Sequence, residues 1–557
     1  MKLPHLKQIL QTTTILLLLC PFLRGEAQVT RQDTLRGSLN AERSWWDVQS
    51  YDLSVKVDIT AQTISGTNRI TYKTNGTPGK TMQLDLQEPM NIDKITFADN
   101  KVLKSLPFTR DGNVYHVDVS SIPAAAKSVS VTIAFSGKPR LAVNPPWDGG
   151  WIFKKDEKGR PWVSVACQGL GASVWYPCKD YQGDEPDAGA KITIDIPDTL
   201  VAVANGKQVA KPVRANGRVL YSWAVKNPIN NYNIIPYIGK YVSFTENFKG
   251  AKGNLKCEYW VLDYDLEKAK KQFGRDVKRM LSCFEDWFGP YPFYEDNYKL
   301  VESPHLGMEH QSAVAYGNKF RDGYLGRDLS GSGWGKDWDY IIVHESGHEW
   351  FGNNITTQDI ADMWVHEGFT SYSEVVFTEC VHGLKAANEY LQGVRRNISN
   401  DRPVIGTYGI NQEGSGDMYA KGANLIHIIR QLIKDDGKFK ELLRGLNREF
   451  YHRTVTSAQV EQYISTKTGI DLTKVFDQYL RATKIPVLEY KIVGMNLTYR
   501  WTGTIDGFNM PVKVWIAGGE HWINPTNEWK TETLTQESED RLLKADPNFY
   551  VKTAQVN

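Results

Sequence analysis

Alternation of apolar and polar residues dominates the chain from about residue 44 to residue 243. A period of two is typical of strands that turn one face to a core and the other to solvent. Glycine, asparagine and proline punctuate the gaps between the alternating stretches, as turns require. The pattern predicts an antiparallel β domain, with strands expected at residues 51–59, 64–72, 129–135 and 191–196.

The period changes to that of helices at about residue 256. Residues 263–288 carry apolar side chains at helical spacing and end before Gly289 and Pro290, which stop a helix. A strand is expected at residues 297–302 and a loop at 303–312. Further helices are expected at residues 340–351, 359–380, 438–451, 457–466 and 471–480.

Alternation returns at residue 485 and continues to the end of the sequence. A chain of 557 residues is long enough for three or four domains. We therefore expect a multidomain α+β protein with an N-terminal antiparallel β domain at residues 28–247. A mainly helical domain follows at residues 248–484, and a small β sandwich at residues 485–557.

The first 27 residues predict a targeting segment rather than part of the fold. Lys2 and Lys7 give a basic start, residues 15–23 form an apolar run too short to span a bilayer, and Gly25 and Ala27 offer small residues for cleavage. We expect export to a periplasmic or extracellular location, with no transmembrane segment after the signal peptide is removed. A lipid anchor on Cys20 is the less favoured alternative, because Leu19 precedes it where a small residue is usual.

Charge and cysteine content exclude several classes of protein. Lysine and arginine number 66 against 64 aspartate and glutamate, with no long run of one sign, so nucleic acid is not expected as a partner. Cysteines remaining after residue 27 are few, and their spacing matches neither a disulfide scaffold nor a zinc site. At most one or two bridges are expected, and Cys167 with Cys178 is only a guess.

The candidate chemistry centres on His344, Glu345 and His348, which lie in a predicted helix. Histidines four residues apart share one helical face, so both imidazoles can bind one metal ion. A catalytic zinc site needs a third protein ligand, and Glu367, on the next predicted helix, is the candidate. Glu345 directly follows the first ligand, where its carboxylate can accept a proton from a water that the metal activates. The pattern indicates one Zn²⁺ per chain.

The segments HESGHEWFGNNIT and WVHEGFTSYSE, which carry these residues, resemble the gluzincin aminopeptidases. That family includes aminopeptidase N and the leukotriene epoxide hydrolase. The resemblance implies a thermolysin-like catalytic domain and peptide substrates with a free N-terminus. The family often continues with a large helical domain. Here strands are expected after residue 484, so we expect an open cleft that accepts longer peptides.

A second motif resembles the family's exopeptidase sequence Gly-x-Met-Glu-Asn. Gly307, Met308 and Glu309 match its core, whereas Leu306 and His310 replace its outer residues. An aminopeptidase must hold a free α-ammonium near its metal, and a fixed carboxylate at Glu309 suits that charge. His310 stands where an amide is usual and could alter binding of the amine.

Two further residues take roles from the same resemblance. Gln168, in a glycine-rich segment of the β domain, would hydrogen-bond the N-terminal residue of the substrate. Tyr419, in a Tyr-x-Lys-Gly-Ala segment, would stabilise the negative charge that builds on the carbonyl oxygen. Tyr408 is a weaker candidate for this role.

Other residues near the motifs can have ordinary structural roles as well. Glu374 shares a helical face with Glu367 and could orient a metal-bound histidine, or could be an ordinary exposed residue. His366 is expected to pack or to support the ligands from outside, and His427 to lie in the core, rather than to bind metal.

Together these observations predict a zinc aminopeptidase that removes N-terminal residues from peptides by attack of an activated water. Endopeptidase activity or epoxide hydrolysis on the same zinc are alternatives, as is a zinc-binding module without catalysis. Comparing peptides with free and acetylated N-termini separates aminopeptidase from endopeptidase activity.

Overall fold

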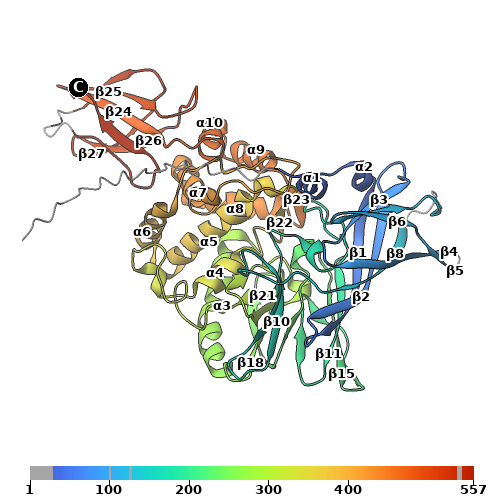
Figure 1. The fold of residues 1–557 in the computed structure, drawn as a ribbon. Coiled ribbons are helices and arrows are strands. Elements are labelled where there is room, and N and C mark those ends of the chain that lie inside the picture. Colours follow the sequence, from blue (N-terminus) through green and yellow to red (C-terminus); the bar gives the residue numbers. More distant parts are fainter. Residues whose placement is uncertain (1–28, 100–101, 124–127, 536–537, 539–541) are drawn as a thin grey trace, which may run out of the picture.

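The protein is described by a computed structural model that covers residues 29–99, 102–123, 128–535, 538 and 542–557. The expected signal peptide, its cleavage site and Cys20 lie outside these residues. Within them, a β-rich N-terminal part is followed by a helical part and a small C-terminal β part (Figure 1). The predicted α+β organisation is confirmed.

A nine-stranded sheet forms the first part, with strand order β13-β15-β11-β1-β2-β8-β4-β5 and β14 paired to β15. Its central strand, β1 (Trp46–Asp58), pairs antiparallel with β2 (Thr63–Thr74) and parallel with β11 (Ala190–Pro197). The alternation seen in the sequence becomes alternating burial, with Leu53, Val55 and Val57 in the core. The remaining strands of the sheet are β4 (Asn91–Asp99), β5 (Val102–Ser105), β8 (Ser128–Gly137), β13 (Lys207–Gln208), β14 (Val213–Ala215) and β15 (Arg218–Val225).

Two smaller sheets complete this part. One has the order β12-β16-β10-β9 and the other β3-β7-β6. Strand β10 (Pro161–Ala166) ends two residues before Gln168, so this sheet fixes where the glycine-rich segment starts. The other strands are β3 (Thr81–Asp85), β6 (Phe108–Asp111), β7 (Val114–Asp118), β9 (Gly150–Lys155), β12 (Val201–Val203) and β16 (Tyr237–Gly239).

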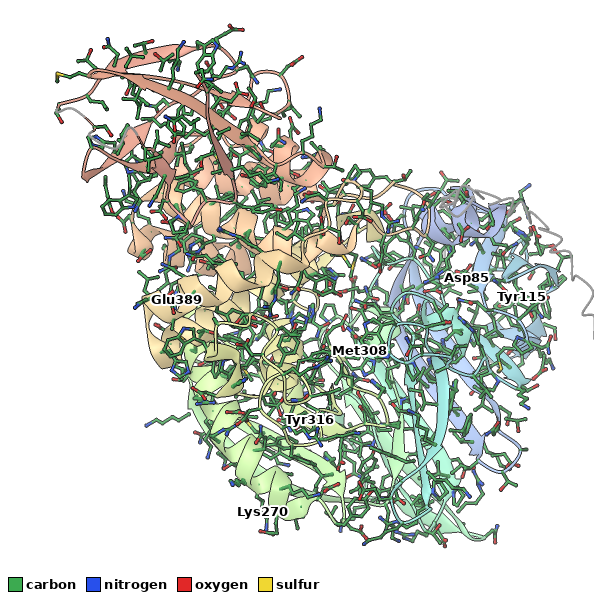
Figure 2. The ribbon with its side chains drawn as sticks, turned by 60° about the vertical axis from the view of Figure 1, so that its left-hand side comes forward. Asp85, Tyr115, Lys270, Met308, Tyr316 and Glu389 are labelled. Atoms are coloured by element: carbon green, nitrogen blue, oxygen red, sulfur yellow. A yellow bond between two sulfur atoms is a disulfide. The ribbon has the colours of Figure 1, made fainter. Side chains whose placement is uncertain are left out.

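A five-stranded sheet, ordered β17-β18-β19-β21-β20, opens the second part. Its first strand, β17 (Tyr241–Gly250), begins a few residues before the boundary expected at residue 248. Its edge strand, β20 (Gly307–Met308), lies where a loop was expected and pairs antiparallel with β21 (Val314–Tyr316). Met308 therefore lies in the middle of the molecule, between the β domain and the helices (Figure 2). The other two strands are β18 (Gly253–Leu262) and β19 (Tyr298–Glu302).

Helices pack beyond this sheet around one large apolar core. The expected helices are present as α3 (Leu266–Phe288), α4 (Tyr340–Gly347), α5 (Trp364–His382), α8 (Asp436–Glu449) and α9 (Ser457–Thr468). The helix expected at 471–480 is shorter, α10 (Thr473–Phe476), and continues as a π-helical turn at Asp477–Arg481. Two more helices are α6 (Leu384–Val394) and α7 (Ala420–Ile433).

The C-terminal part contains two small sheets, ordered β28-β25-β24-β30 and β27-β26-β29. Its strands begin at β24 (Val487–Val493), close to the expected start at residue 485. The others are β25 (Asn496–Thr502), β26 (Val512–Ile516), β27 (Gly519–Ile523), β28 (Lys530–Thr533), β29 (Lys544–Ala545) and β30 (Lys552–Gln555).

A disulfide joins Cys283 of α3 to Cys380 of α5 and ties together two helices of the helical part. Cys167 and Cys178 are buried free thiols, so the guess that they pair is wrong. Burial raises the pKa of both, which leaves them as unreactive thiols at neutral pH. Among the described residues, no helix combines the length and apolar character needed to cross a bilayer.

Two short helices precede strand β1: α1 (Arg31–Gly37) and α2 (Ala41–Ser44). Neither has an apolar periodicity that the sequence could reveal. Figure 1 shows α1 at the end of the β domain that faces the helical part.

Candidate active site

Helix α4 carries the first part of the site, and its start is fixed by a buried carboxylate. Asp339 accepts hydrogen bonds from the backbone N–H groups of Ile341 and Ile342, at 3.1 and 3.3 Å. Such an N-cap satisfies donors that the first turn leaves without partners. His344 lies within the helix and His348 at its C-cap, so one turn separates the two imidazoles.

Glu367, from α5, completes a cluster with these histidines. Its Oε2 atom lies 3.7 Å from Nε2 of His344 and 3.3 Å from Nε2 of His348. All three residues are buried, and their ligand atoms lie within 4.8 Å of one another. Among the described residues, Glu367 Oε2 has no hydrogen-bond partner, which is costly for a buried carboxylate. Two histidines and one carboxylate, whose oxygen has no other partner, fit a zinc ion.

The far sides of both imidazoles are held by other groups. His344 Nδ1 lies 2.7 Å from Oε1 of Glu374, whose Oε2 accepts a hydrogen bond of 2.6 Å from Tyr390. His348 Nδ1 lies 2.9 Å from the carbonyl oxygen of Phe351. A carbonyl only accepts, so Nδ1 of His348 carries the proton and its Nε2 keeps a lone pair for a metal. Glu374 is thus placed to orient His344, which is one of the two roles that its helical spacing predicted.

Glu345 faces the same space from the next position of α4. Gly307, on strand β20, passes so close that a Cβ atom there would lie 2.6 Å from Glu345 Oε1. Burial raises the pKa of Glu345 to about 7, the nearby His344 opposes this shift, and the carboxylate of Glu309 adds to it. A carboxyl with this pKa can both accept and return a proton near neutral pH.

Glu309 follows β20 and is buried beside the metal cluster. Its Oε1 accepts hydrogen bonds from Nε2 of Gln168, at 2.5 Å, and from the hydroxyl of Tyr232, at 2.8 Å. Its carbonyl oxygen accepts from Nδ2 of Asn353 at 2.8 Å. One oxygen of Glu309, one of Glu345 and a nitrogen of His348 fall within 4.8 Å of one another. The structure therefore brings together two predicted residues from different domains, Gln168 and Glu309.

His310 turns away from this arrangement. It is fully buried, and its Nδ1 lies 2.5 Å from the hydroxyl of Tyr237. Burial holds its pKa well below the ordinary value, so the ring is neutral. His310 is not among the residues that line the cleft, whereas Leu306, Gly307 and Met308 are.

Tyr419 directly precedes α7 and lines the same cleft, and 36% of the residue is exposed. Its ring stacks against that of His344, with centroids 6.1 Å apart and planes 24° apart. Tyr408 is elsewhere: its hydroxyl donates to Oδ1 of Asp362 at 2.6 Å.

His366 and His427, for which packing roles were expected, lie outside the metal cluster. His366 accepts a hydrogen bond from the backbone N–H of Thr357 at 2.8 Å, and His427 lies 3.2 Å from the hydroxyl of Tyr372. Both are fully buried.

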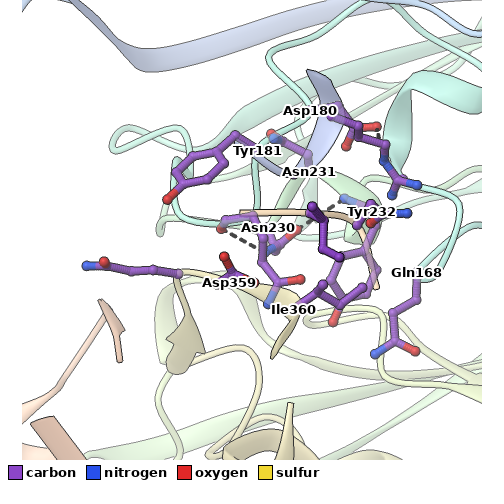
Figure 3. Close-up of a pocket in the computed structure, with 15 residues that line it drawn as sticks. Gln168, Asp180, Tyr181, Asn230, Asn231, Tyr232, Asp359 and Ile360 are labelled. Atoms are coloured by element: carbon purple, nitrogen blue, oxygen red, sulfur yellow. Dashed lines mark hydrogen bonds and ion pairs between the residues drawn. The ribbon is translucent and has the colours of Figure 1, made fainter. Parts of the chain in front are cut away.

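A cleft of about 710 Å³ joins these residues between the β domain and the helical part. The β domain contributes Pro146, Trp147 and the segment 168–170, and the helical part contributes the metal cluster, Glu309, Glu345, Glu413 and Tyr419. A smaller pocket adjoins it, in which Gln168, Tyr232 and Ile360 are drawn together (Figure 3). Both domains are thus needed to form the site.

Family models match both of these parts of the chain. The Peptidase M1 N-terminal domain matches residues 48–232, and the Peptidase family M1 domain matches residues 275–479, which include the whole metal cluster. The chain belongs to the M1 peptidase family.

Relatives of this M1 peptidase are distant. Aminopeptidase N of Lactobacillus helveticus is 24% identical over 484 residues, covering 79% of this chain and 51% of its own length. Human aminopeptidase B is 23% identical over 367 residues, 63% of this chain and 52% of its own length. The chain spans about half the length of the curated relatives it matches.

Solved structures support the fold. A variant of the M1 zinc metallopeptidase from Deinococcus radiodurans, bound to a Tyr-Ser-Ala substrate, aligns with a TM-score of 0.66 at 19% identity. The alignment covers 80% of this chain and 96% of that one. Another structure, of a two-domain M1 zinc metallopeptidase variant bound to L-arginine, gives 0.65 at 20% identity, over 79% of this chain and 95% of that one.

Sequence reasoning missed three side chains that shape this M1 site. They are Tyr232, Asn353 and Tyr390, which lie 77, 44 and 16 positions from the groups they hold, and each residue type is common. Only Asn353 stands near a motif, five residues after His348. Tyrosine by itself carries no signal in a chain with 27 of them.

Proposed function

We propose that this M1 peptidase is a zinc-dependent aminopeptidase that removes N-terminal residues from peptides. One observation carries the proposal: the carboxylate of Glu309 is fixed by Gln168 and Tyr232 in the same cleft as the metal cluster. Both hydrogen bonds go to Oε1. Oε2 is left to pair with a substrate ammonium at a set distance from the metal.

His344, His348 and Glu367 would hold the zinc. When bound, zinc polarises the peptide carbonyl and lowers the pKa of a water to about 7. The hydrogen bonds that Nδ1 of each histidine donates keep the Nε2 atoms directed at this position.

Glu345 would serve as general base and then as general acid. Its carboxylate accepts a proton from the attacking water and returns it to the amine that leaves. A pKa of about 7 suits both steps, because a group that is half protonated at working pH can do either.

Tyr419 would support the reacting carbonyl from across the cleft. Burial of its polar end raises the pKa of its phenol, and the negative charges of Glu367 and Glu413 add to this effect. The hydroxyl therefore keeps its proton and can donate it in a hydrogen bond to the carbonyl oxygen as negative charge builds there.

Glu309 also favours the aminopeptidase hypothesis over the endopeptidase hypothesis. An acetylated N-terminus carries no charge and would leave Oε2 of this buried carboxylate without a partner, which costs about 1–3 kcal/mol. An endopeptidase would have no use for such an anchor. The proposed enzyme therefore cuts one residue from the N-terminus at each encounter.

We also propose that the protein is exported to a periplasmic or extracellular location. The support is the basic start, short apolar run and small residues within positions 1–27. Peptides in that compartment would be its substrates.

The decisive experiment compares hydrolysis of matched peptides with free and acetylated N-termini by the purified mature protein. A Glu345→Gln variant and a zinc chelator serve as controls. Cleavage of the free peptide alone, lost in both controls, is the expected result. Cleavage of both peptides would replace the proposal with endopeptidase activity, and cleavage of neither would leave the non-catalytic or epoxide hypotheses.

A further inference from the structure

Helix α1 lies outside both segments that match the M1 family models, yet it contacts loops on both sides of the cleft. None of its residues is buried, so it adds little to the apolar core. Arg36 and Gly37, at its C-terminal end, line the small pocket. Figure 3 shows Gln168 and Tyr232 in the same pocket. The position of α1 thus calls for a role other than core packing.

Arg36 holds the loop that carries Gln168. Its Nη1 donates a hydrogen bond of 3.1 Å to the carbonyl oxygen of Gly169, and its Nε lies 3.4 Å from Oδ2 of Asp180. Gly171 packs closely against the same side chain, because a Cβ atom at position 171 would lie 2.4 Å from Nη2 of Arg36. The φ of Gly171, +86°, also favours glycine. The guanidinium thus fills the inside of this loop.

Asp180 fixes the far end of the loop. Its carboxylate accepts hydrogen bonds from the backbone N–H groups of Ala172 and Ser173, at 3.3 and 3.2 Å. Arg36 and Asp180 together pin segment 168–173 at both ends. The Arg36 side chain is only 20% exposed, so water weakens this pair less than an ordinary surface ion pair.

The second loop, from the helical part, is held by the backbone of α1. The N–H of Asn411 donates to the carbonyl oxygen of Asp33 at 3.1 Å. Gly37 packs directly on Ile410, since a Cβ atom at position 37 would lie 2.3 Å from the Ile410 carbonyl carbon. The loop continues into Gln412 and Glu413, which line the cleft. One short helix therefore joins cleft walls that come from two domains.

We propose that Arg36 is a positioning residue for the amine anchor. It holds the carbonyl of Gly169 and so fixes the position of the neighbouring Gln168. Gln168 in turn donates the 2.5 Å hydrogen bond that orients Glu309. The effect on catalysis rests on the aminopeptidase activity proposed above, whereas the effect on the loop does not.

Helix α1 supplies its own control residue. Arg31 pairs with Asp111 at 2.5 Å and is 65% exposed, so Arg31→Ala removes a cation from the same helix without touching either cleft loop. The test variants are Arg36→Ala and Arg36→Lys. Lysine has a single charged head and cannot keep both the Gly169 and Asp180 contacts, so partial rescue is expected.

Hydrogen exchange measured by mass spectrometry tests the loop without any need for turnover. Arg36→Ala should speed exchange of the amides at residues 169–173, with Arg31→Ala matching the wild type. Unchanged exchange in Arg36→Ala would overturn the proposal, whatever the protein's activity. Wild-type protein that exchanges as expected but cleaves no peptide would instead disprove only the proposed function.

Kinetics then test the route through Gln168. With a free-amine tripeptide, Arg36→Ala should raise KM about three- to tenfold with little change in kcat, as expected for loss of one hydrogen bond in binding. In a Gln168→Ala background the same change should have little further effect, because both act on Glu309 by one route. Effects on KM that multiply in the double variant would refute the coupling.

Discussion

Oε1 of Glu374 lies 2.7 Å from Nδ1 of His344, and this contact fixes which nitrogen of the histidine faces the metal cluster. Tyr390 holds the other oxygen of the same carboxylate at 2.6 Å. Such outer contacts typically change metal affinity by about 10- to 100-fold when they are removed. Orientation of the first ligand therefore depends on α6 as well as on α4 and α5.

The first prediction is that Glu374→Ala weakens zinc binding by about 10- to 100-fold, because His344 loses both its partner and its fixed orientation. Competition with a chromogenic chelator measures the change. Glu441→Ala is the matched control, since its exposed pair with Arg448 lies on α8, away from the site. Equal zinc affinity in Glu374→Ala and wild type would show that Glu374 does not orient the ligand.

The second prediction concerns the approach of strand β20 to the general base. Gly307→Ala places a Cβ atom 2.6 Å from Oε1 of Glu345 and 2.9 Å from Cγ2 of Ile341, so the carboxylate must move. A displaced general base loses much of its contribution, which is typically about 10²- to 10⁴-fold. We expect a fall in kcat while zinc content stays at one per chain.

Gly274→Ala controls for the added methyl group, because nothing lies within 4 Å of a Cβ atom there and alanine favours helix α3. Normal kcat in Gly307→Ala would mean that Glu345 tolerates displacement. Loss of zinc in that variant would move the effect from the base to the metal ligands.

The third prediction assigns the hydroxyl of Tyr419 to the transition state. Tyr419→Phe keeps the ring that stacks on His344 but removes the donor, so kcat should fall about 10²- to 10³-fold with little change in KM. Tyr408→Phe removes a hydroxyl bound to Asp362 outside the cleft and should leave kcat unchanged. A KM effect alone in Tyr419→Phe would place this residue in substrate binding.

Local sequence patterns predicted those parts of the site that lie within single helices. His344 and His348 share a face because they are one turn apart, and Glu374 follows Glu367 by two turns. The strands of the β domain were readable for the same reason, because alternation translates directly into burial. Periodicity within one element needs no knowledge of its neighbours.

The remainder depended on contacts between distant segments. Tyr232 reaches Glu309 across 77 positions of sequence, and Cys283 meets Cys380 across 97. Strand β20 has two residues, too few to show any period, so a loop was expected there. Helix α1 has no buried face, and its contacts with the cleft loops are invisible without the fold.

The fourth prediction concerns pH and a carboxyl group away from the metal. Glu185 is buried, and among the described residues its Oε1 has no hydrogen-bond partner. Burial raises its pKa from 4.5 to about 8. Between these values the folded protein holds a proton that the unfolded chain releases, so this group makes the free energy of unfolding fall as pH rises.

Glu185→Gln should therefore resist thermal unfolding better than the wild type at pH 8.5, and the advantage should vanish at about pH 3.5, below both pKa values, where the wild-type group is protonated in both states. One pKa unit corresponds to about 1.4 kcal/mol, so the gain is at most several kcal/mol. Unfolding midpoints at both pH values measure it. Glu267→Gln, at a side chain 81% exposed on α3, should show no such pH dependence. A constant difference between Glu185→Gln and wild type across the range would mean that Glu185 stays ionised in the folded protein.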